Sequence, residues 1–183
     1  NEQKKLYLAY LQAIKGEISD EINTNGYNRS HIKILAGLTR LRQLCCHPGI
    51  FIEDYKGDSG KLDSLVEIVE EAVKGDHRIL IFSQFTTMLQ KIKNTFEAKG
   101  INCQYLDGST PMKERGESVR SFNKGRGDVF LISLKAGGTG LNLTSADMVI
   151  HYDPWWNPAV EDQATDRAHR IGQENTVQVI KLI

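Results

Sequence analysis

A glycine-rich run at residues 133–142 has the residue types that suit anion binding. Gly137, Gly138 and Gly140 fall within four positions, just after a short apolar segment. Glycines let the backbone approach a ligand closely and point N–H groups at it, and Lys135 adds a positive charge suited to phosphate. The run therefore predicts a phosphate-binding turn. A tight turn that binds nothing is the alternative.

The glycine-rich run does not fit two common nucleotide fingerprints. A dinucleotide fingerprint that begins with Gly138 and Gly140 needs a glycine at position 143, which is Leu143. A phosphate loop of Walker type needs Gly-Lys-Ser/Thr after a strand. Gly60 and Lys61 are followed by leucine, and no strand is expected before them. Neither motif is therefore predicted in this chain.

A second candidate group combines two arginines with two other polar residues. A spacing of three or four positions predicts that all four share one face of a helix. They are Gln163, Asp166, Arg167 and Arg170. Guanidinium forks one turn apart suit a phosphate with developing charge, so the arginines could reach a nucleotide held by another domain. The alternative is a solvated helix face with Asp–Arg pairs.

Both tryptophans of the chain lie in the run Tyr-Asp-Pro-Trp-Trp-Asn-Pro at residues 152–158. A turn bracketed by prolines does not easily bury two indoles. We therefore expect one of Trp155 and Trp156 to pack under the loop and the other to face a partner. The alternative is that both are packing residues.

No metal site is predicted. Cys45, Cys46 and His47 are adjacent, and adjacent side chains rarely point at one ion. With Cys103, these cysteines are interpreted as small buried thiols in a reducing compartment.

Alternating helices and strands are predicted from residue 61 onward, and these elements must position the candidate residues. Short apolar runs predict strands, and apolar residues at helical spacing predict the helices between them. Strands are expected at residues 78–83, 101–106, 129–133, 148–152 and 177–182. Helices are expected at residues 62–73, 86–99, 111–123 and 157–169. This alternation predicts an α/β fold, with a parallel sheet covered by helices on both faces.

Polar residues follow four of the predicted strands. They lie at residues 83–84, 107–109, 133–140 and from 153 onward. Ligands of open parallel sheets bind beyond the carboxyl ends of the strands. The sequence therefore predicts that the candidate residues meet at one edge of the sheet.

Residues 1–56 are predicted to form a helical extension, with a polar break at residues 23–26 and an end at Pro48. A charged, glycine-containing stretch at residues 53–60 predicts a linker. We therefore expect two domains, residues 1–56 and residues 57–183. Because the chain ends within an apolar, strand-like run, the second domain is expected to be truncated at its carboxyl-terminal end.

Charge alone does not indicate a nucleic-acid-binding protein. The 183 residues include 23 basic and 23 acidic side chains, so the formal net charge is zero. Any contact with DNA must come from a local patch rather than from a global field. No run approaches the roughly 20 apolar residues that a membrane helix needs, and no signal peptide is recognised.

Five motifs occur in order along the chain. They are Ile-Phe-Ser-Gln-Phe at residues 81–85, Leu-Asp-Gly-Ser-Thr at 106–110, Lys-Ala-Gly-Gly-Thr-Gly-Leu-Asn-Leu at 135–143, Asp-Pro-Trp-Trp-Asn-Pro at 153–158 and Gln-Ala-Thr-Asp-Arg-Ala-His-Arg-Ile-Gly-Gln at 163–173. The series resembles the carboxyl-terminal lobe of Swi/Snf-family ATPases, within helicase superfamily two. Residues 38–48 resemble the segment just before that lobe. The tryptophan pair with the last motif separates this family from RNA helicases.

The resemblance implies a RecA-like lobe preceded by a helical protrusion. It implies the second motor lobe of an ATP-dependent translocase on double-stranded DNA, of the chromatin-remodelling type. The implied cofactor is ATP with Mg, at a site shared with an amino-terminal RecA-like lobe that carries the Walker lysine and the Mg ligands. That lobe and double-stranded DNA are the implied partners, with no membrane. Alone, the chain is expected to be an inactive monomer. The location is expected to be intracellular, in the cytoplasm or nucleoid of a prokaryote or in the nucleus of a eukaryote.

The resemblance also implies roles for individual residues. Arg167 and Arg170 resemble arginine fingers, with Gln163 orienting the phosphate region. The residues implied to line the nucleotide cleft are Gly138, Gly140 and Asn142. Those implied to touch the phosphate backbone of one DNA strand are Ser83, Gln84, Gly108, Ser109, Ser133 and Lys135. Trp155 and Trp156 would lie in the loop that couples the cleft to the DNA.

Two other functions stay open. One is an RNA-directed helicase lobe of the same superfamily, which ATP turnover stimulated more by RNA than by duplex DNA would favour. The other is a non-catalytic module that docks proteins through the tryptophan loop, which activity insensitive to both arginines would favour.

Overall fold

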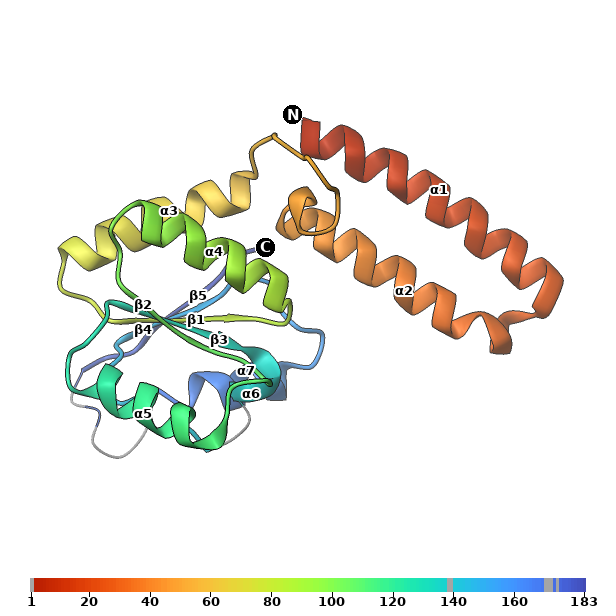
Figure 1. Ribbon diagram of the computed structural model, residues 1–183. Coiled ribbons are helices and arrows are strands. Elements are labelled where there is room, and N and C mark those ends of the chain that lie inside the picture. The colour runs from red at the N-terminus through yellow and green to blue at the C-terminus, as the bar shows by residue number, and fades with distance from the viewer. Residues whose placement is uncertain (1, 138–139, 170–172, 174) are drawn as a thin grey trace. The chain divides into compact units, whose positions relative to one another are not determined.

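The chain forms two compact units, Asn1–Leu62 and Asp63–Ile183. The computed structural model describes residues 2–137, 140–169, 173 and 175–183 (Figure 1). The sequence placed a domain boundary after residue 56, within the segment that joins the helices of the first unit to α3 (Gly60–Lys74).

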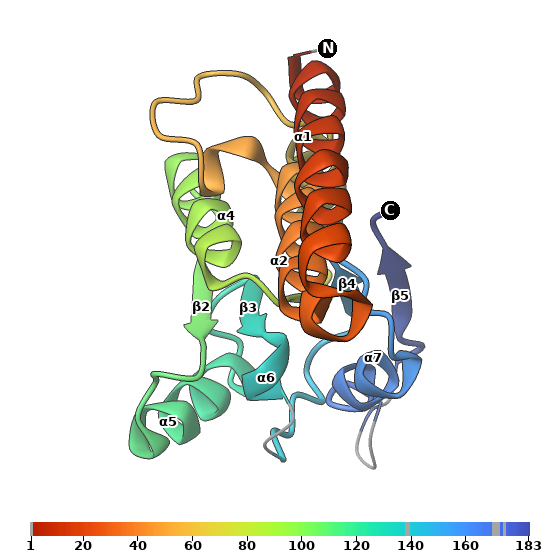
Figure 2. The same cartoon turned by 90° about the vertical axis from the view of Figure 1, so that its right-hand side faces the viewer.

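The first unit is built on a helical hairpin. α1 (Glu2–Asn25) and α2 (Tyr27–Cys46) lie side by side (Figure 2), separated by one residue, Gly26. Gly26 has φ of +75°, a left-handed conformation that favours glycine and turns the chain back. A Cβ atom on Gly37 would lie only 2.6 Å from Ile14 Cγ2. The absence of a side chain there allows the two helices to pack closely.

The segment after the hairpin is held by hydrogen bonds to the end of α2. A 3-10 turn, η1 (Pro48–Ile50), follows α2, and His47 Nδ1 accepts a hydrogen bond from the Gly49 amide at 2.9 Å. Ser59 Oγ donates to the Cys46 carbonyl at 2.8 Å. Part of the predicted linker is therefore packed against the hairpin rather than extended into solvent.

Among the described residues, the second unit contains a five-stranded parallel sheet with the order β2-β3-β1-β4-β5. Its strands are β1 (Ile79–Ser83), β2 (Cys103–Leu106), β3 (Val129–Ser133), β4 (Met148–His151) and β5 (Gln178–Lys181). Each lies within one of the five predicted strand segments. Because all strands run in the same direction, their carboxyl ends lie at one edge of the sheet.

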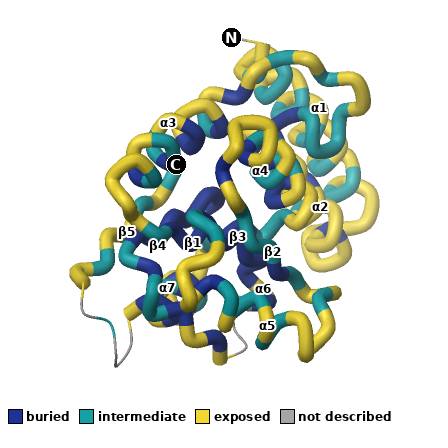
Figure 3. Tube along the Cα trace, turned by 60° about the vertical axis from the view of Figure 1, so that its left-hand side comes forward, coloured by how far each residue is buried: buried dark blue, intermediate teal, exposed yellow. Residues whose placement is uncertain are grey.

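Helices cover both faces of this sheet. α3 and α4 (Thr86–Ala98) lie on one face, and α5 (Met112–Asn123), α6 (Leu134–Gly137) and α7 (Pro158–Thr165) lie on the other (Figure 1). Strands β1, β3 and β4 are buried along their whole length (Figure 3), as expected of strands covered on both sides. The predicted α/β fold, a parallel sheet with helices on both faces after a helical extension, is confirmed.

Two local predictions differ from the structure. The glycine-rich run begins with the short helix α6 rather than with a turn. The helix predicted to reach residue 169 ends at Thr165, because the chain then tightens. The amides of Arg167 and Ala168 bond carbonyls three residues back, at 3.2 and 3.0 Å, and the Arg167 carbonyl accepts from the Leu143 amide at 2.9 Å. The Arg167 carbonyl is thus used in a tertiary hydrogen bond.

Two kinds of feature are absent from the part of the chain that the structure describes. None of the helices there combines the length and the hydrophobicity needed to cross a membrane. Likewise, that part of the chain holds no group of three or more His, Cys, Asp or Glu side chains placed to share a metal ion.

Candidate functional site

The carboxyl edge of the sheet brings together segments that are far apart in the sequence. The Gln84 amide, just after β1, donates to Asp153 Oδ2 at 3.1 Å, just after β4. The Tyr152 amide donates to the Phe82 carbonyl at 3.0 Å, so the pairing of β1 with β4 continues past the last residue of β4. The predicted meeting of the post-strand segments at one edge is therefore observed.

Two of the predicted DNA-contacting residues are buried at this edge. Ser83 is 1% exposed, and its Oγ accepts a hydrogen bond from the Phe85 amide at 3.1 Å. Ser133 is 4% exposed, and its Oγ accepts from the Ala136 amide at 3.3 Å. Both hydroxyls shape the turns that follow β1 and β3. In this conformation burial keeps them from direct contact with a large ligand, which the sequence did not reveal.

The segment after β2 is a tightly bonded turn that presents Gly108 and Ser109 to solvent. Asp107 Oδ1 accepts from the Ser109 amide at 2.8 Å and from Ser109 Oγ at 2.6 Å. Hydrogen bonds, with that from Ser109 Oγ as the main cause, hold the pKa of the Asp107 carboxyl below its ordinary value. Burial, followed by the bond to Asp107, raises the pKa of Tyr105 to about 12. Asp107 thus stays an anion that organises the turn.

Arg115 braces the same turn from the side. Its Nε donates to the Thr110 carbonyl at 2.7 Å, and its Nη2 donates to the carbonyls of Asp107 and Gly108 at 3.2 and 3.0 Å. This arginine in α5 was not among the predicted residues. An arginine one turn into a helix that follows a polar turn is a signal that could have suggested it.

The glycine-rich run ends next to the arginine-containing run, which is the motif at residues 163–173. Lys135, in α6, is exposed, as are Gly140 and Asn142. Gly140 has φ of +61°, a backbone conformation that favours glycine. The amide of Leu143, the residue that follows the glycine-rich run, donates a hydrogen bond to the Arg167 carbonyl. Gly138, which was predicted to line the cleft, lies outside the described residues.

The arginine-containing run does not form the single polar helix face that the sequence predicted. Gln163 is exposed within α7 and Asp166 is exposed in the turn after it, whereas Arg167 is only 4% exposed. Arg167 therefore does not share the exposed surface that carries Gln163. Arg170 lies outside the described residues.

The two tryptophans divide as predicted between the interior and the surface. Trp155 is half-buried and packs against the apolar core, whereas Trp156 is 55% exposed. Their ring centroids are 5.1 Å apart, with an angle of 52° between the planes. A pocket of about 310 Å³ lies beside them and is lined by Gln84, Leu134, Lys135, Trp155 and Val160. Two predicted DNA contacts and a predicted coupling residue thus share one pocket.

A buried carboxylate, Glu161 of α7, holds the tryptophan loop, residues 152–158. Glu161 is 3% exposed; its Oε1 accepts from the Trp155 amide at 2.6 Å, and its Oε2 pairs with Lys181 Nζ at 2.5 Å. Burial by itself would raise the pKa of this carboxyl, but hydrogen bonds from Lys181 and the Trp155 amide outweigh burial and lower the pKa. Sequence reasoning missed this pair because no local spacing relates Lys181 to Glu161.

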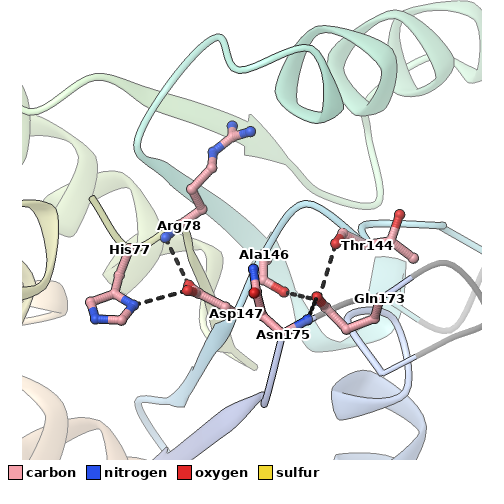
Figure 4. A network of polar contacts seen from close by, with 7 residues as sticks. All are labelled: His77, Arg78, Thr144, Ala146, Asp147, Gln173 and Asn175. Carbon is pink, nitrogen blue, oxygen red and sulfur yellow. Dashed lines mark hydrogen bonds and ion pairs between the residues drawn. The ribbon is translucent and has the colours of Figure 1, made fainter. Parts of the chain in front are cut away.

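At the opposite, amino edge of the sheet, a side-chain amide ties the end of the arginine-containing run to the loop before β4 (Figure 4). Gln173 Nε2 donates to the carbonyls of Thr144 and Ala146 at 3.0 and 2.6 Å. Gln173 Oε1 accepts from the Asn175 amide at 2.8 Å. Gln173, the last residue of the motif at 163–173, therefore helps to hold the fold together. Its place in the motif did not indicate this role.

Asp147 forms the second half of this amino-edge network (Figure 4). Its Oδ1 accepts from the Arg78 amide at 3.0 Å, and its Oδ2 lies 2.9 Å from His77 Nδ1. These bonds connect the residue before β4 to the two residues before β1. Both carboxylate oxygens of Asp147 are therefore used within the protein.

Comparison with known protein families and curated proteins gives one consistent set of matches. The helicase conserved C-terminal domain family matches residues 60–172. A putative ATP-dependent helicase/translocase of Bacillus subtilis is 42% identical over 180 residues, covering 95% of this chain and 19% of the relative. The mouse SWI/SNF-related matrix-associated actin-dependent regulator of chromatin subfamily A member 1 is 39% identical over 177 residues, covering 90% of this chain and 17% of the relative. The chain thus spans less than a fifth of the length of these relatives.

Solved structures agree with these matches. The C-terminal domain of the Sulfolobus solfataricus SWI2/SNF2 ATPase is 33% identical, with a TM-score of 0.79 over 100% of this chain and 74% of that one. The ATPase core of the same name, solved in complex with double-stranded DNA, is 34% identical, with a TM-score of 0.83 over 100% of this chain and 38% of that one.

Proposed function

Since the chain belongs to the helicase conserved C-terminal domain family, within the SWI/SNF ATPases, we propose that it is the second motor lobe of an ATP-dependent translocase on double-stranded DNA. In this role it contributes one half of an ATP site and one half of a DNA track. The observation that carries the proposal is the hydrogen bond of 2.9 Å between the Leu143 amide and the Arg167 carbonyl. It brings Arg167 beside the residue that follows the glycine-rich run.

The residues of this chain fit the phosphate end of a nucleotide better than they fit a magnesium ion. Glycine amides and guanidinium groups are donors suited to phosphate oxygens. Within the described residues there is no cluster of acidic side chains for a metal. In this proposal an amino-terminal lobe binds ATP and Mg and supplies the Walker lysine and the Mg ligands. Bound ATP supplies the phosphoryl group that is hydrolysed.

In this proposal Arg167 and Arg170 act as arginine fingers, and Gln163 orients the phosphate region. Arg167 is only 4% exposed in this chain, so its role requires that closure against the amino-terminal lobe uncovers its guanidinium group. Gly138, Gly140 and Asn142 line the nucleotide cleft. Arginine fingers stabilise charge that grows in the transition state, so they affect turnover more than binding. A lobe that holds only the fingers cannot hydrolyse ATP. We therefore expect the chain on its own to be an inactive monomer.

The exposed residues at the ends of β1, β2 and β3 form the proposed DNA track. These strands are neighbours in the order β2-β3-β1, so their carboxyl ends form a continuous row. The exposed or half-buried residues in the row are Gln84, Gly108, Ser109 and Lys135. Ser83 and Ser133 are buried behind this row, where their hydroxyls hold the turns that carry it. Contacts of this type to phosphates allow stepping along DNA without sequence preference.

This function implies a location with the chromosomal DNA. We propose the nucleoid in a prokaryote or the nucleus in a eukaryote. Whether the motor moves nucleosomes or other DNA-bound proteins would depend on domains outside the chain.

The test measures ATP turnover after the chain is rejoined to its amino-terminal lobe, with and without duplex DNA. We expect stimulation by duplex DNA, and a fall of roughly 10³-fold or more in turnover for Arg170→Ala, by analogy with other arginine fingers. Arg126→Ala, on an exposed surface, is the control and should keep full turnover. Full turnover in Arg170→Ala would contradict the finger role, and stronger stimulation by RNA than by duplex DNA would point to an RNA-directed lobe.

A further inference from the structure

The two oxygens of the Glu161 carboxylate bind different parts of the protein. Oε1 accepts from the Trp155 amide in the tryptophan loop at 2.6 Å, and Oε2 pairs with Lys181 in β5 at 2.5 Å. Glu161 itself lies in the first turn of α7, which Asn157 caps through a hydrogen bond from the Ala159 amide at 3.1 Å. One side chain therefore joins a loop, a helix and a strand.

Stability alone does not explain why a charge is placed there. The Glu161 side chain is 4% exposed, whereas that of Lys181 is 45% exposed. Burying a carboxylate removes its hydration, and apolar residues of the same volume often stabilise a protein as well as a buried ion pair does. What an apolar residue could not do is fix the position of the Trp155 amide while also holding Lys181. The arrangement therefore favours a positioning role.

Glu161 lies between the two proposed functional surfaces, the DNA track and the arginine-containing run. On one side, Trp155 lines the pocket shared with Gln84 and Lys135, which belong to the proposed DNA track. On the other side, α7 ends at Thr165, only two residues before Arg167. A shift of the tryptophan loop caused by DNA would thus pull on the Glu161 carboxylate and move the helix that precedes the arginines.

We propose that Glu161 is a positioning residue that transmits DNA binding from the tryptophan loop to α7 and thereby to the arginine-containing run. The proposal rests on the function proposed above and names the side chain through which its DNA track and its ATP site communicate. Glu161 touches neither nucleotide nor DNA in this mechanism. Its effect is to make ATP turnover depend on DNA.

The test uses the rejoined two-lobe protein and measures ATP turnover with saturating duplex DNA and without DNA. Glu161→Ala removes both bonds, and we expect the ratio of stimulated to basal turnover to fall about tenfold or more. Glu161→Gln keeps an acceptor for the Trp155 amide but loses the ion pair, and Lys181→Met also loses the ion pair. Both should lower the ratio by a smaller, similar factor. The double variant of Glu161→Gln with Lys181→Met should lower the ratio no further than either of these two single changes. The same ion pair is lost in all three proteins.

Hydrogen exchange of the Trp155 amide, measured in the same protein, reports directly on its hydrogen bond to Glu161. The amide should exchange faster in Glu161→Ala than in the unchanged protein, and at an intermediate rate in Glu161→Gln. Glu114→Gln, an exposed carboxylate in the first turn of α5, is the matched control and should change neither the ratio nor the exchange.

Two outcomes would overturn the proposal by itself. One is an unchanged ratio in Glu161→Ala. The other is an equal loss of basal and stimulated turnover together with a lower melting temperature in both Glu161→Ala and Glu161→Gln, which would indicate a purely structural role. If the unchanged protein shows no stimulation by DNA at all, the proposed function fails as well. The two failures are therefore distinguishable.

Discussion

At the amino edge of the sheet, Asp147 and Gln173 use their side-chain oxygens and nitrogens in bonds to other parts of the protein. At the carboxyl edge, Lys135 is exposed, and the Gln84 side-chain nitrogen is buried without a hydrogen-bond partner among the described residues. Polar side chains occur in the loops at both edges, so residue type alone does not distinguish the edges. The carboxyl edge also contains internal bonds, at Asp107, Asp153 and Glu161. The difference is that it keeps the donors of Gln84 and Lys135 available for a ligand, whereas the described polar groups of Asp147 and Gln173 hold the fold together.

The largest effect is expected where a structural bond at the amino edge also serves the site. Gln173→Glu replaces an amide nitrogen with a carboxylate oxygen facing the carbonyls of Thr144 and Ala146. Since unpaired buried acceptors cost about 1–3 kcal/mol, we expect a loss of that size in the free energy of unfolding. The same segment leads to Arg170, so ATP turnover of the rejoined protein should also fall. Urea unfolding and turnover measure the two effects.

Gln178→Glu is the control for this change, because Gln178 is exposed on β5. It should alter neither quantity beyond about 0.5 kcal/mol, as is usual for surface substitutions. A Gln173→Glu variant with normal turnover would show that this bond has no role beyond stability.

A purely structural effect is expected for Asp147→Ala. The change leaves the Arg78 amide without the acceptor at 3.0 Å and removes the contact with His77. We expect a loss of about 1–3 kcal/mol in the free energy of unfolding, and unchanged turnover per folded molecule. Asp162→Ala, an exposed residue of α7, should keep its stability. Lower turnover per folded Asp147→Ala molecule would contradict the claim that Asp147, at the amino edge, serves stability alone.

The carboxyl edge should respond in the opposite way. Lys135→Ala removes an exposed cation from the proposed DNA track, so DNA affinity should fall several-fold and the dependence of affinity on salt should weaken by about one phosphate contact. The free energy of unfolding should change by less than about 0.5 kcal/mol. Salt titrations of DNA binding and urea unfolding give both values. Lys91→Ala, on α4, is a control expected to keep the salt dependence.

The smallest effect concerns the turn after β2. Because the pKa of Asp107 is lowered in the folded protein, its stabilisation is present above the ordinary aspartate pKa of about 3.9 and is lost as pH falls from there through the folded value. Asp107→Asn should therefore be less stable than the unchanged protein at neutral pH, and the difference should shrink on acidification. Urea unfolding between pH 3 and pH 7 measures it. A difference that grows on acidification would contradict the assignment.

Several features could be predicted from the sequence because they depend on local patterns. Continuous apolar runs such as Val129–Ser133 must be buried on both faces, and their alternation with helices leaves few arrangements other than a covered parallel sheet. Once the sheet is parallel, residues after the strands must meet at one edge. The division of the two tryptophans also followed from their crowded loop. The family followed from the order of five motifs.

Other features depended on neighbours that no local pattern identifies. Spacing predicted a helix through Arg167, but the helix ends at Thr165, and the Arg167 carbonyl accepts a hydrogen bond from the distant Leu143 amide. Likewise, the serines that end β1 and β3 have the residue type of a ligand contact, yet they are buried and their hydroxyls accept bonds from amides of the turns that follow. Glu161 finds Lys181 only because β5 lies beside β4.

The amino-acid sequence by itself thus determined which segments are buried, in what class of fold, and which residue types line the carboxyl edge. These properties follow from hydrophobic periodicity and backbone preference, whose free energies are local and repeat along the chain. Only the tertiary structure decided which polar side chains are used internally and which remain available to a ligand. That division rests on single hydrogen bonds between segments distant in sequence, and each depends on the position of a neighbour that folding alone supplies.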